Sequence, residues 1–191
     1  MGISIVVIVL LTLYVVFAYN KFVKLTQQAK EAWADIDVQL KRRYDLIPNL
    51  IETVKGYAGH ERQTLEQVTA ARAAATQTHV DPSNLTADSI AAMAGAESAL
   101  TGALGRLMAI AENYPDLKAN TNFLELQREL SDTENKIQAA RRFYNGNVRD
   151  LNIALKSFPS NVVASMFSFK EEPYFELEEN SVEREAVKVQ F

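Results

Sequence analysis

An unbroken apolar run opens the chain. Residues Ile3 to Ala18 carry no charge, and their only polar side-chain atoms are three hydroxyls. As an α-helix this run extends roughly 24 Å, slightly less than the ~30 Å hydrocarbon core of a bilayer. Tyr19 and Phe22 extend it into the interfacial layer, where aromatic rings are favoured. The pattern predicts a transmembrane anchor over residues 1–20.

A cleaved signal peptide is the alternative interpretation of the same run. Residues 16–18 (VFA) would pass as a small-residue cleavage site. A signal peptide also needs a basic region before its apolar run, and here only the terminal amine of Met1 lies there. In addition, Phe22 and Leu25 continue the helical period beyond the run. We therefore expect an uncleaved anchor.

Lysines after the run predict its orientation. Lys21, Lys24 and Lys30 follow it closely, whereas no lysine or arginine precedes it. Positive residues mark the cytoplasmic end of a membrane helix. We therefore expect a single-pass protein of the bacterial inner (cytoplasmic) membrane, with its N-terminus outside and its C-terminal domain in the cytoplasm. A domain outside the cytoplasm is the alternative.

Two long stretches place apolar residues at alternating spacings of three and four, which is the coiled-coil period. The first continues directly from the anchor, so one helical rod is expected to leave the bilayer and enter the domain. Pro48 interrupts this rod, and we expect a kink near Tyr44 rather than an end, because the apolar phase survives the proline. The second ends at Pro159. The apolar positions are Phe22, Leu25, Ala29, Trp33, Ile36, Leu40, Tyr44 and Ile47 in the first seam, and Phe123, Leu126, Leu130, Thr133, Ile137, Ala140, Tyr144, Val148, Leu151, Leu155 and Phe158 in the second.

Between these seams, residues 87–113 predict a helix with two opposite stripes. One stripe has large side chains, which should face the core. The other has small residues, which would let a second helix approach closely, although each glycine costs ~1 kcal/mol in a helix. A plain solvent-facing surface is the alternative interpretation. The large stripe is Ile90, Met93, Leu100, Leu104, Leu107 and Ala111, and the small stripe is Ala91, Gly95, Ser98, Gly102, Gly105 and Ala109.

The C-terminal part has a different composition. Residues 171–185 contain seven glutamates and one arginine, which predicts a solvated acidic tail. Its last five residues alternate apolar and polar, so Val187, Val189 and Phe191 are candidate partner contacts. The chain is thus divided into an anchor at 1–20, a helical domain at 21–169 and an acidic tail at 170–191.

Charge and residue types exclude several functions. The net charge of −4 argues against a nucleic-acid partner, and the absence of cysteine excludes thiolate chemistry. Neither His60 nor His79 follows a glutamate at the spacing of a di-iron site, and no nucleophile elbow or phosphate loop is present. We expect no catalytic residues, no metal and no cofactor.

Two basic clusters are the strongest polar candidates, and two interpretations are open for both. The side chains could pair with carboxylates of neighbouring helices, or they could bind an anionic partner. The residues are Lys41, Arg42, Arg43, Arg141 and Arg142.

Long segments of the chain resemble the LemA family. These are residues 33–61 (WADIDVQLKRRYDLIPNLIETVKGYAGHE) and 112–144 (ENYPDLKANTNFLELQRELSDTENKIQAARRFY), together with the pairs at 158–159 and 175–176. The resemblance covers nearly the whole chain. It implies an all-α fold, with one N-terminal transmembrane helix followed by an antiparallel bundle of long helices. It implies no known enzyme activity.

These features favour a membrane-anchored scaffold or adaptor. We expect it to contact the lipid bilayer, to form a homo-oligomer and to recruit other membrane proteins. One alternative is an accessory factor of envelope stress or membrane proteolysis. A ligand-binding or enzymatic bundle is the other, and it would need a buried pocket lined by Arg42, Arg141 and carboxylates.

Overall fold

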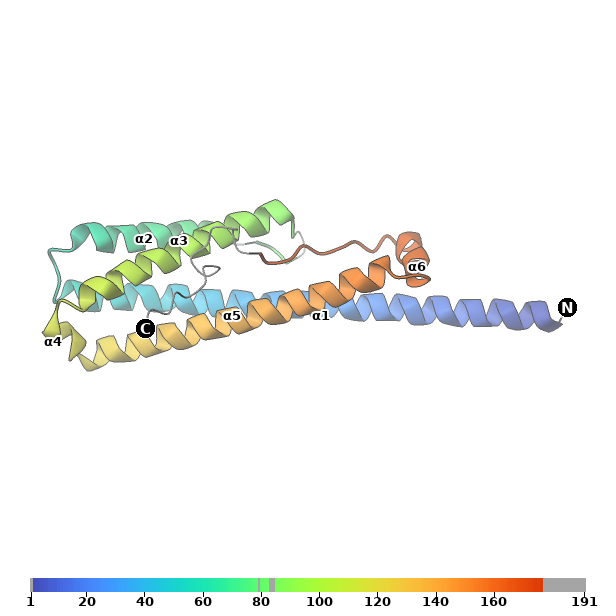
Figure 1. Ribbon diagram of the computed structural model, residues 1–191, viewed down its shortest axis with the longest axis horizontal. Helices are drawn as coiled ribbons and strands as arrows, with labels where there is room; N and C mark the ends of the chain where they lie inside the picture. The colour runs from blue at the N-terminus through green and yellow to red at the C-terminus, as the bar shows by residue number, and fades with distance from the viewer. Residues whose placement is uncertain (1, 79, 83–84, 177–191) are drawn as a thin grey trace, which may run out of the picture.

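The computed structural model describes residues 2–78, 80–82 and 85–176, which form helices and connecting segments without a strand (Figure 1). Two helices are much longer than the rest, α1 (Gly2–Lys55) and α5 (Thr121–Lys156). The shorter helices are α2 (Arg62–Gln77), α3 (Ala87–Ala111), α4 (Pro115–Lys118) and α6 (Ser160–Met166). The predicted all-α class is confirmed.

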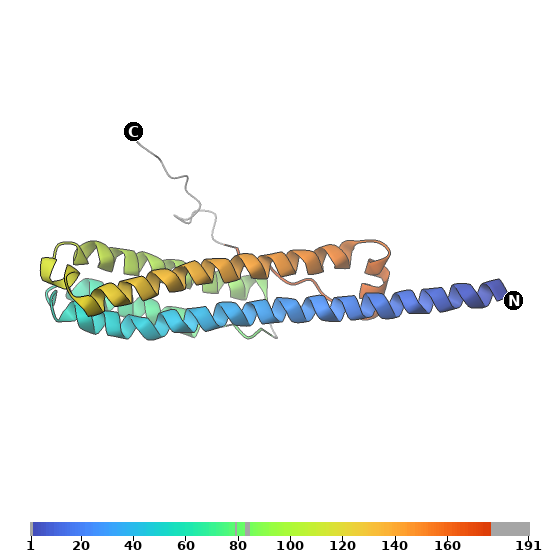
Figure 2. The same ribbon diagram turned by 90° about the horizontal axis from the view of Figure 1, so that it is seen from below.

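The helices pack as two antiparallel pairs. One pair is α1 beside α5, and the other is α2 beside α3 (Figures 1 and 2). The α2–α3 pair covers only the half of the α1–α5 pair that lies farther from the N-terminus, and the N-terminal part of α1 projects beyond the bundle. This arrangement is the expected antiparallel bundle on an apolar N-terminal helix.

Buried side chains form three successive clusters along the bundle. The distal cluster joins α1, α2, α3 and α5, the middle one centres on Trp33 and Tyr144, and the third lies where α1 leaves the bundle. Most of the predicted seam positions are buried. Phe158 is an exception, because it is 84% exposed after the end of α5.

Pro48 lies inside α1, which continues as a helix to Lys55. The helix therefore does not end at the proline, and the chain turns at residues 56–61 instead. A proline has no N–H to donate to the carbonyl four residues earlier, which here belongs to Tyr44. Arg72 of α2 donates from Nε to this carbonyl oxygen at 2.7 Å. A side chain of the neighbouring helix thus replaces the missing backbone hydrogen bond.

The half of the α1–α5 pair nearer the N-terminus is covered by α6 and the extended segment that follows it (Figure 1). Two asparagines of α5 hold this segment. Asn145 donates to the carbonyl of Phe175 at 3.0 Å and accepts from its N–H at 2.8 Å. Asn152 makes the same pair of bonds with Glu172, at 2.9 and 3.1 Å. Seven helical residues and three extended residues each span about 10 Å, so the two amides match the backbone that they bind.

These contacts correct the expected start of the solvated tail. Phe175 is buried between Trp33 and the guanidinium of Arg141, which lies 4.4 Å from the centre of its ring. The segment therefore docks through an aromatic ring and neutral backbone amides despite its glutamates. Burial raises the pKa of Glu172, although Lys30 opposes this shift. Residues 177–191 lie outside the described residues.

The role of Arg72 can be tested by a double-mutant cycle with Pro48. Arg72→Met should destabilise the protein by about 1–2 kcal/mol, because the Tyr44 carbonyl loses its donor. In a Pro48→Ala background the same substitution should cost about 1 kcal/mol less, because residue 48 then supplies the helical N–H. Thermal unfolding followed by circular dichroism measures both effects. Arg62→Met, on the exposed face of α2, is the control, and equal costs in the two backgrounds would contradict this explanation.

Candidate functional site

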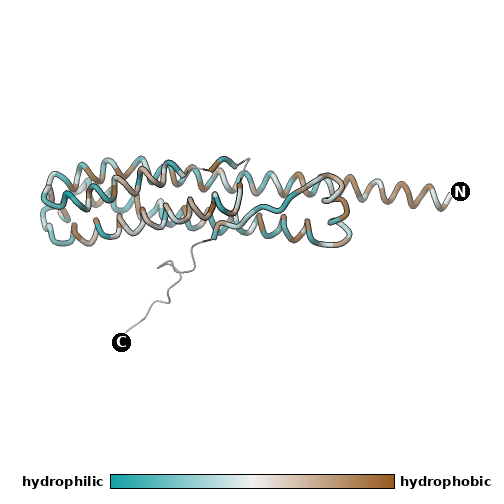
Figure 3. Tube along the Cα trace, turned by 90° about the horizontal axis from the view of Figure 1, so that it is seen from above, coloured by the Kyte–Doolittle hydropathy of each residue, from teal (hydrophilic) through white to brown (hydrophobic). Residues whose placement is uncertain are grey.

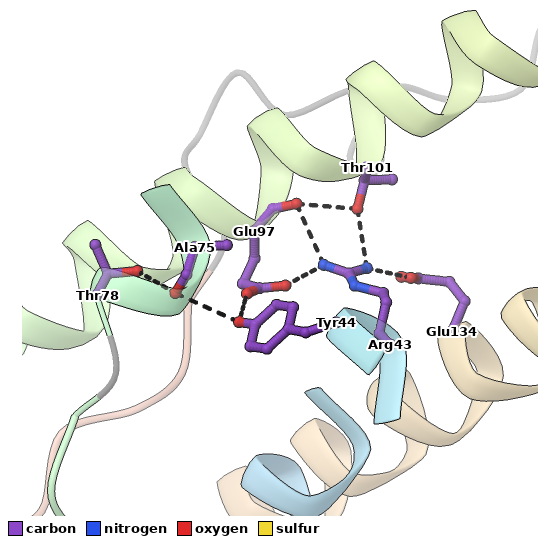
Figure 4. Close-up of polar contacts among 7 residues, drawn as sticks. All are labelled: Arg43, Tyr44, Ala75, Thr78, Glu97, Thr101 and Glu134. Carbon is purple, nitrogen blue, oxygen red and sulfur yellow. Dashed lines mark hydrogen bonds and ion pairs between the residues drawn. The ribbon is translucent and has the colours of Figure 1, made fainter. Parts of the chain in front are cut away.

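A buried ionic network lies where the two helix pairs meet (Figure 4). At its centre is Arg43 of α1, which is only 2% exposed. Its guanidinium donates to Glu97 of α3 and to Glu134 of α5, and one of its terminal nitrogens lies 3.2 Å from the Thr101 hydroxyl oxygen. One side chain of α1 therefore binds both α3 and α5.

Tyr44 extends the network to α2. Its hydroxyl donates to Glu97, and the same hydroxyl lies 3.5 Å from the carbonyl oxygen of Ala75 near the end of α2. Burial and the neighbouring Glu97 raise the pKa of Tyr44 well above its ordinary value. The phenol is therefore a proton donor at neutral pH, and it binds the carboxylate oxygen that Arg43 leaves free.

The network supports packing more than ligand binding. The free space beside it is about 10 Å³, lined by residues that include Arg43, Glu97 and Arg141. A buried water molecule needs about this much space, so no larger ligand fits. A buried ion pair gains little net stability over apolar packing, but it is costly to break and can select one arrangement of the helices. This network therefore fixes how the α2–α3 pair sits on the α1–α5 pair.

Of the basic residues predicted from the sequence, only Arg43 and Arg141 line the same small cavity, and the others lie elsewhere. Arg42 pairs with Glu129 and lies 3.8 Å from Asp132, whereas Arg43 is buried in the network. For these two arginines the structure agrees with pairing to carboxylates. Arg141 stacks over Phe175, and Lys41 and Arg142 are exposed.

The small-residue stripe of α3 lies on the outer face of the bundle. Gly95 is partly buried, and the rest of the stripe is exposed: Ala91, Ser98, Gly102, Gly105 and Ala109. A Cβ atom added at Gly102 or Gly105 would meet no other atom within 4 Å. The other predicted contacts, Val187, Val189 and Phe191, lie outside the described residues.

Within the described part of the chain, no group of three or more His, Cys, Asp or Glu side chains could hold a metal ion. His60 is exposed in the turn between α1 and α2, and His79 is not described. A wider hollow between these two helices is open to solvent and lined by residues that include Lys55, Leu65 and Glu66. It contains no buried polar side chain that could orient a ligand.

Sequence reasoning missed four residues that organise the structure, namely Arg72, Glu97, Asn145 and Asn152. The sequence did contain a signal for Glu97, which is the only charged residue between Asp88 and Arg106. It lies on the same helix face as the large-residue stripe, between Met93 and Leu100. A lone acid at a core position indicates a buried cation partner. For the asparagines the signal was weaker: two amides seven residues apart, beside the apolar seam of a long helix.

Removing the central charge should be strongly destabilising. In Arg43→Met the carboxylates of Glu97 and Glu134 lose their cation, which should cost about 3–5 kcal/mol and lower Tm by on the order of 10 °C. Changing both glutamates to glutamine in that background should restore part of the loss. Lys41→Met, an exposed position of the same helix, should leave Tm nearly unchanged. If Arg43→Met melts like the parent, the network does not hold the helix pairs together.

Comparisons with known proteins agree with this architecture. The chain is 26% identical to "Magnetosome protein MamQ" of Magnetospirillum gryphiswaldense over 192 residues, covering 92% of this chain and 71% of that protein. "Magnetosome protein MamQ 2" of Paramagnetospirillum magneticum is 24% identical over 193 residues, with the same coverage. "Protein LemA" of Metamycoplasma hominis is 27% identical over 145 residues, covering 76% of this chain and 63% of that protein. The model of the LemA family matches residues 32–191. The chain therefore belongs to the LemA family.

Proposed function

We propose that this protein is a membrane-anchored helical scaffold or adaptor, which holds a rigid bundle in the cytoplasm and presents it to other proteins. The observation that carries the proposal is the continuity of α1. One 54-residue helix begins with exposed apolar side chains and continues into the core of the bundle. Figure 3 shows the apolar part projecting beyond the rest of the molecule.

The exposure of this segment supports a membrane environment. Only 6% of its most apolar 18-residue window is buried within the protein. A core helix of a soluble protein would bury most of such a window, because exposed apolar surface in water is unfavourable. A lipid bilayer covers the same side chains without further protein contacts. The lysines at 21, 24 and 30 support a cytoplasmic bundle.

The continuity also supports a presenting role. From Ala18 to its end at Lys55, α1 rises about 55 Å as a helix, with no flexible linker between anchor and bundle. The distal turns are therefore held at a fixed distance from the bilayer. The names of the relatives mention no enzyme activity, and the cavity beside the Arg43 network is too small for a substrate.

Self-association through the small-residue stripe of α3 is part of this proposal. The stripe lies outside the core, and the open space at Gly102 and Gly105 would let another helix approach closely. Confinement in one membrane raises the effective concentration of the copies, so weak contacts suffice. Val187, Val189 and Phe191 stay candidate partner contacts.

The orientation can be measured by labelling, because the chain contains no cysteine. Val38→Cys places a thiol on an exposed site of the bundle, and Gly2→Cys places one at the N-terminus. In intact cells a maleimide that cannot cross the inner membrane should label position 2 and spare position 38. Position 38 should react after the membrane is permeabilised. Labelling of position 38 in intact cells would place the bundle outside the cytoplasm.

Bulky residues on the stripe should disrupt the assembly without unfolding the bundle. In Gly102→Leu with Gly105→Leu, the Cβ atom at each position meets no other atom within 4 Å, and both positions are exposed. Loss of each glycine should favour the helix by up to ~1 kcal/mol. We expect native mass spectrometry of the full chain to show smaller particles while Tm holds or rises. Gly146→Leu is the control, at a partly buried glycine of α5 where an added Cβ likewise meets no atom within 4 Å. A monomeric parent, or an unchanged mass in the double variant, would leave the stripe as a plain solvent face.

A further inference from the structure

The corner where α5 turns into α6 carries a group of exposed apolar side chains. No charged residue lies between Lys156 and Lys170. α6 buries Val163 and Ala164 against the bundle but leaves its other apolar side chains uncovered. The exposed apolar residues of this corner are Phe158, Val162, Met166 and Phe167, at 84%, 53%, 67% and 46% exposure.

This corner packs directly on the apolar part of α1. Ala18 and Phe22 share a cluster with Val163 and Ala164, and Tyr14 and Val15 pack against that cluster. The ring of Tyr19 lies 4.8 Å from that of Phe167. The uncovered apolar side chains of α6 therefore lie next to the apolar part of α1.

Helix geometry places the corner at the edge of the membrane. The uncharged run of α1 from Ile3 to Ala18 extends about 24 Å, so a ~30 Å hydrocarbon layer would reach about four residues further, to the level of Phe22. The residues of α1 that contact α6 lie within these last turns. The rings of Tyr19, Phe22 and Phe169 meet there, with centroids 5.6 and 5.1 Å apart, at the depth where aromatic side chains are enriched.

Part of the polar backbone of the corner is hydrogen-bonded within the protein. Hydrogen bonds in such surroundings must be made within the protein. The Ser157 N–H bonds to the Ile153 carbonyl, and the Asn161 N–H bonds to the Ser157 carbonyl at 2.8 Å. The Ser160 hydroxyl oxygen lies 2.7 Å from the Ala154 carbonyl, and Pro159 has no N–H to satisfy.

Lysines surround the corner. Lys21, Lys24, Lys156 and Lys170 are exposed, and Lys156 lies 2.8 Å from Glu171. Lysines at this position meet the headgroup layer, where phosphates are the natural counter-charges. Exposed apolar side chains flanked by lysines are typical of a segment that enters the interfacial layer without crossing the bilayer.

We propose that the α5–α6 corner is a second membrane contact, which inserts Phe158, Val162, Met166 and Phe167 into the interfacial layer of the bilayer that α1 crosses. This inference rests on the proposed anchor. The corner lies beside α1 at the end of the bundle where α1 leaves it. A second attachment there, off the axis of α1, fixes the rotation of the bundle about that axis, which a single transmembrane helix leaves free. The distal face then has a defined direction relative to the membrane.

The test uses the full chain in vesicles of phosphatidylethanolamine and phosphatidylglycerol. Val162→Cys and Met166→Cys carry an environment-sensitive fluorophore at exposed positions, so labelling displaces no core side chain. Val38→Cys, an apolar residue of similar exposure (60%) in the middle of α1, is the matched control. Leu10→Cys reports on the anchor itself. Lipids with a nitroxide near the headgroup or near the bilayer centre serve as quenchers.

The labels at 162 and 166 should be quenched by the shallow nitroxide several-fold more than the label at 38. The label at 10 should respond most to the deep nitroxide. If the corner labels behave like position 38, the corner proposal is wrong, and quenching at 10 shows that the anchor still holds. Corner labels that are shielded from a water-soluble quencher but insensitive to the lipid nitroxides would also overturn it, because protein then covers the patch. If the label at position 10 is not quenched, the anchor is refuted. The proposed second contact with the bilayer that α1 crosses is then refuted with it.

Discussion

The arrangement of the bundle depends on one buried guanidinium. Arg43 cannot be withdrawn from water without partners, and its partners come from two other helices, Glu97 of α3 and Glu134 of α5. In a purely apolar interface, a shift of one helix by a turn exchanges one apolar contact for a similar one, so its free-energy cost is smaller. A guanidinium between two carboxylates allows no such freedom, since a shifted register would leave a charge buried and unpaired. The two helix pairs therefore have one favourable way to meet.

A second constraint acts close by on the same helix. Pro48 deprives the Tyr44 carbonyl of its helical donor, and Arg72 of α2 supplies a replacement. The side chain of Tyr44 meanwhile binds Glu97. The carbonyl and the side chain of Tyr44 thus bind α2 and α3, respectively. Because Pro48 leaves the Tyr44 carbonyl without its helical donor, that carbonyl is available to bind α2.

Much of the fold could be predicted from the sequence, because periodicity reports burial directly. The seams identified α1 and α5, and the large-residue stripe identified the buried face of α3. The site was harder to predict, since its partners lie far apart in sequence: Arg43 and Glu134 are separated by 91 positions. The docking of residues 170–176 was missed because charge composition suggested solvation, while the decisive contacts are backbone amides held by Asn145 and Asn152. Such pairings depend on geometry that no local pattern reveals.

The continuity of α1 from its apolar segment into the bundle has a mechanical consequence for a protein anchored as proposed. A rod that rises perpendicular to a sheet of lipid keeps the same spacing from its neighbours at both ends only when the sheet is flat. When the sheet curves, the far tips of adjacent rods converge on the concave side and spread on the convex side. The fractional change equals the height of the rod divided by the radius of curvature. If α1 crosses the bilayer as proposed, with the edge of the hydrocarbon near Phe22, the rod rises about 50 Å from it. The spacing of its tips would then change more on bending than that of a short or flexibly tethered domain.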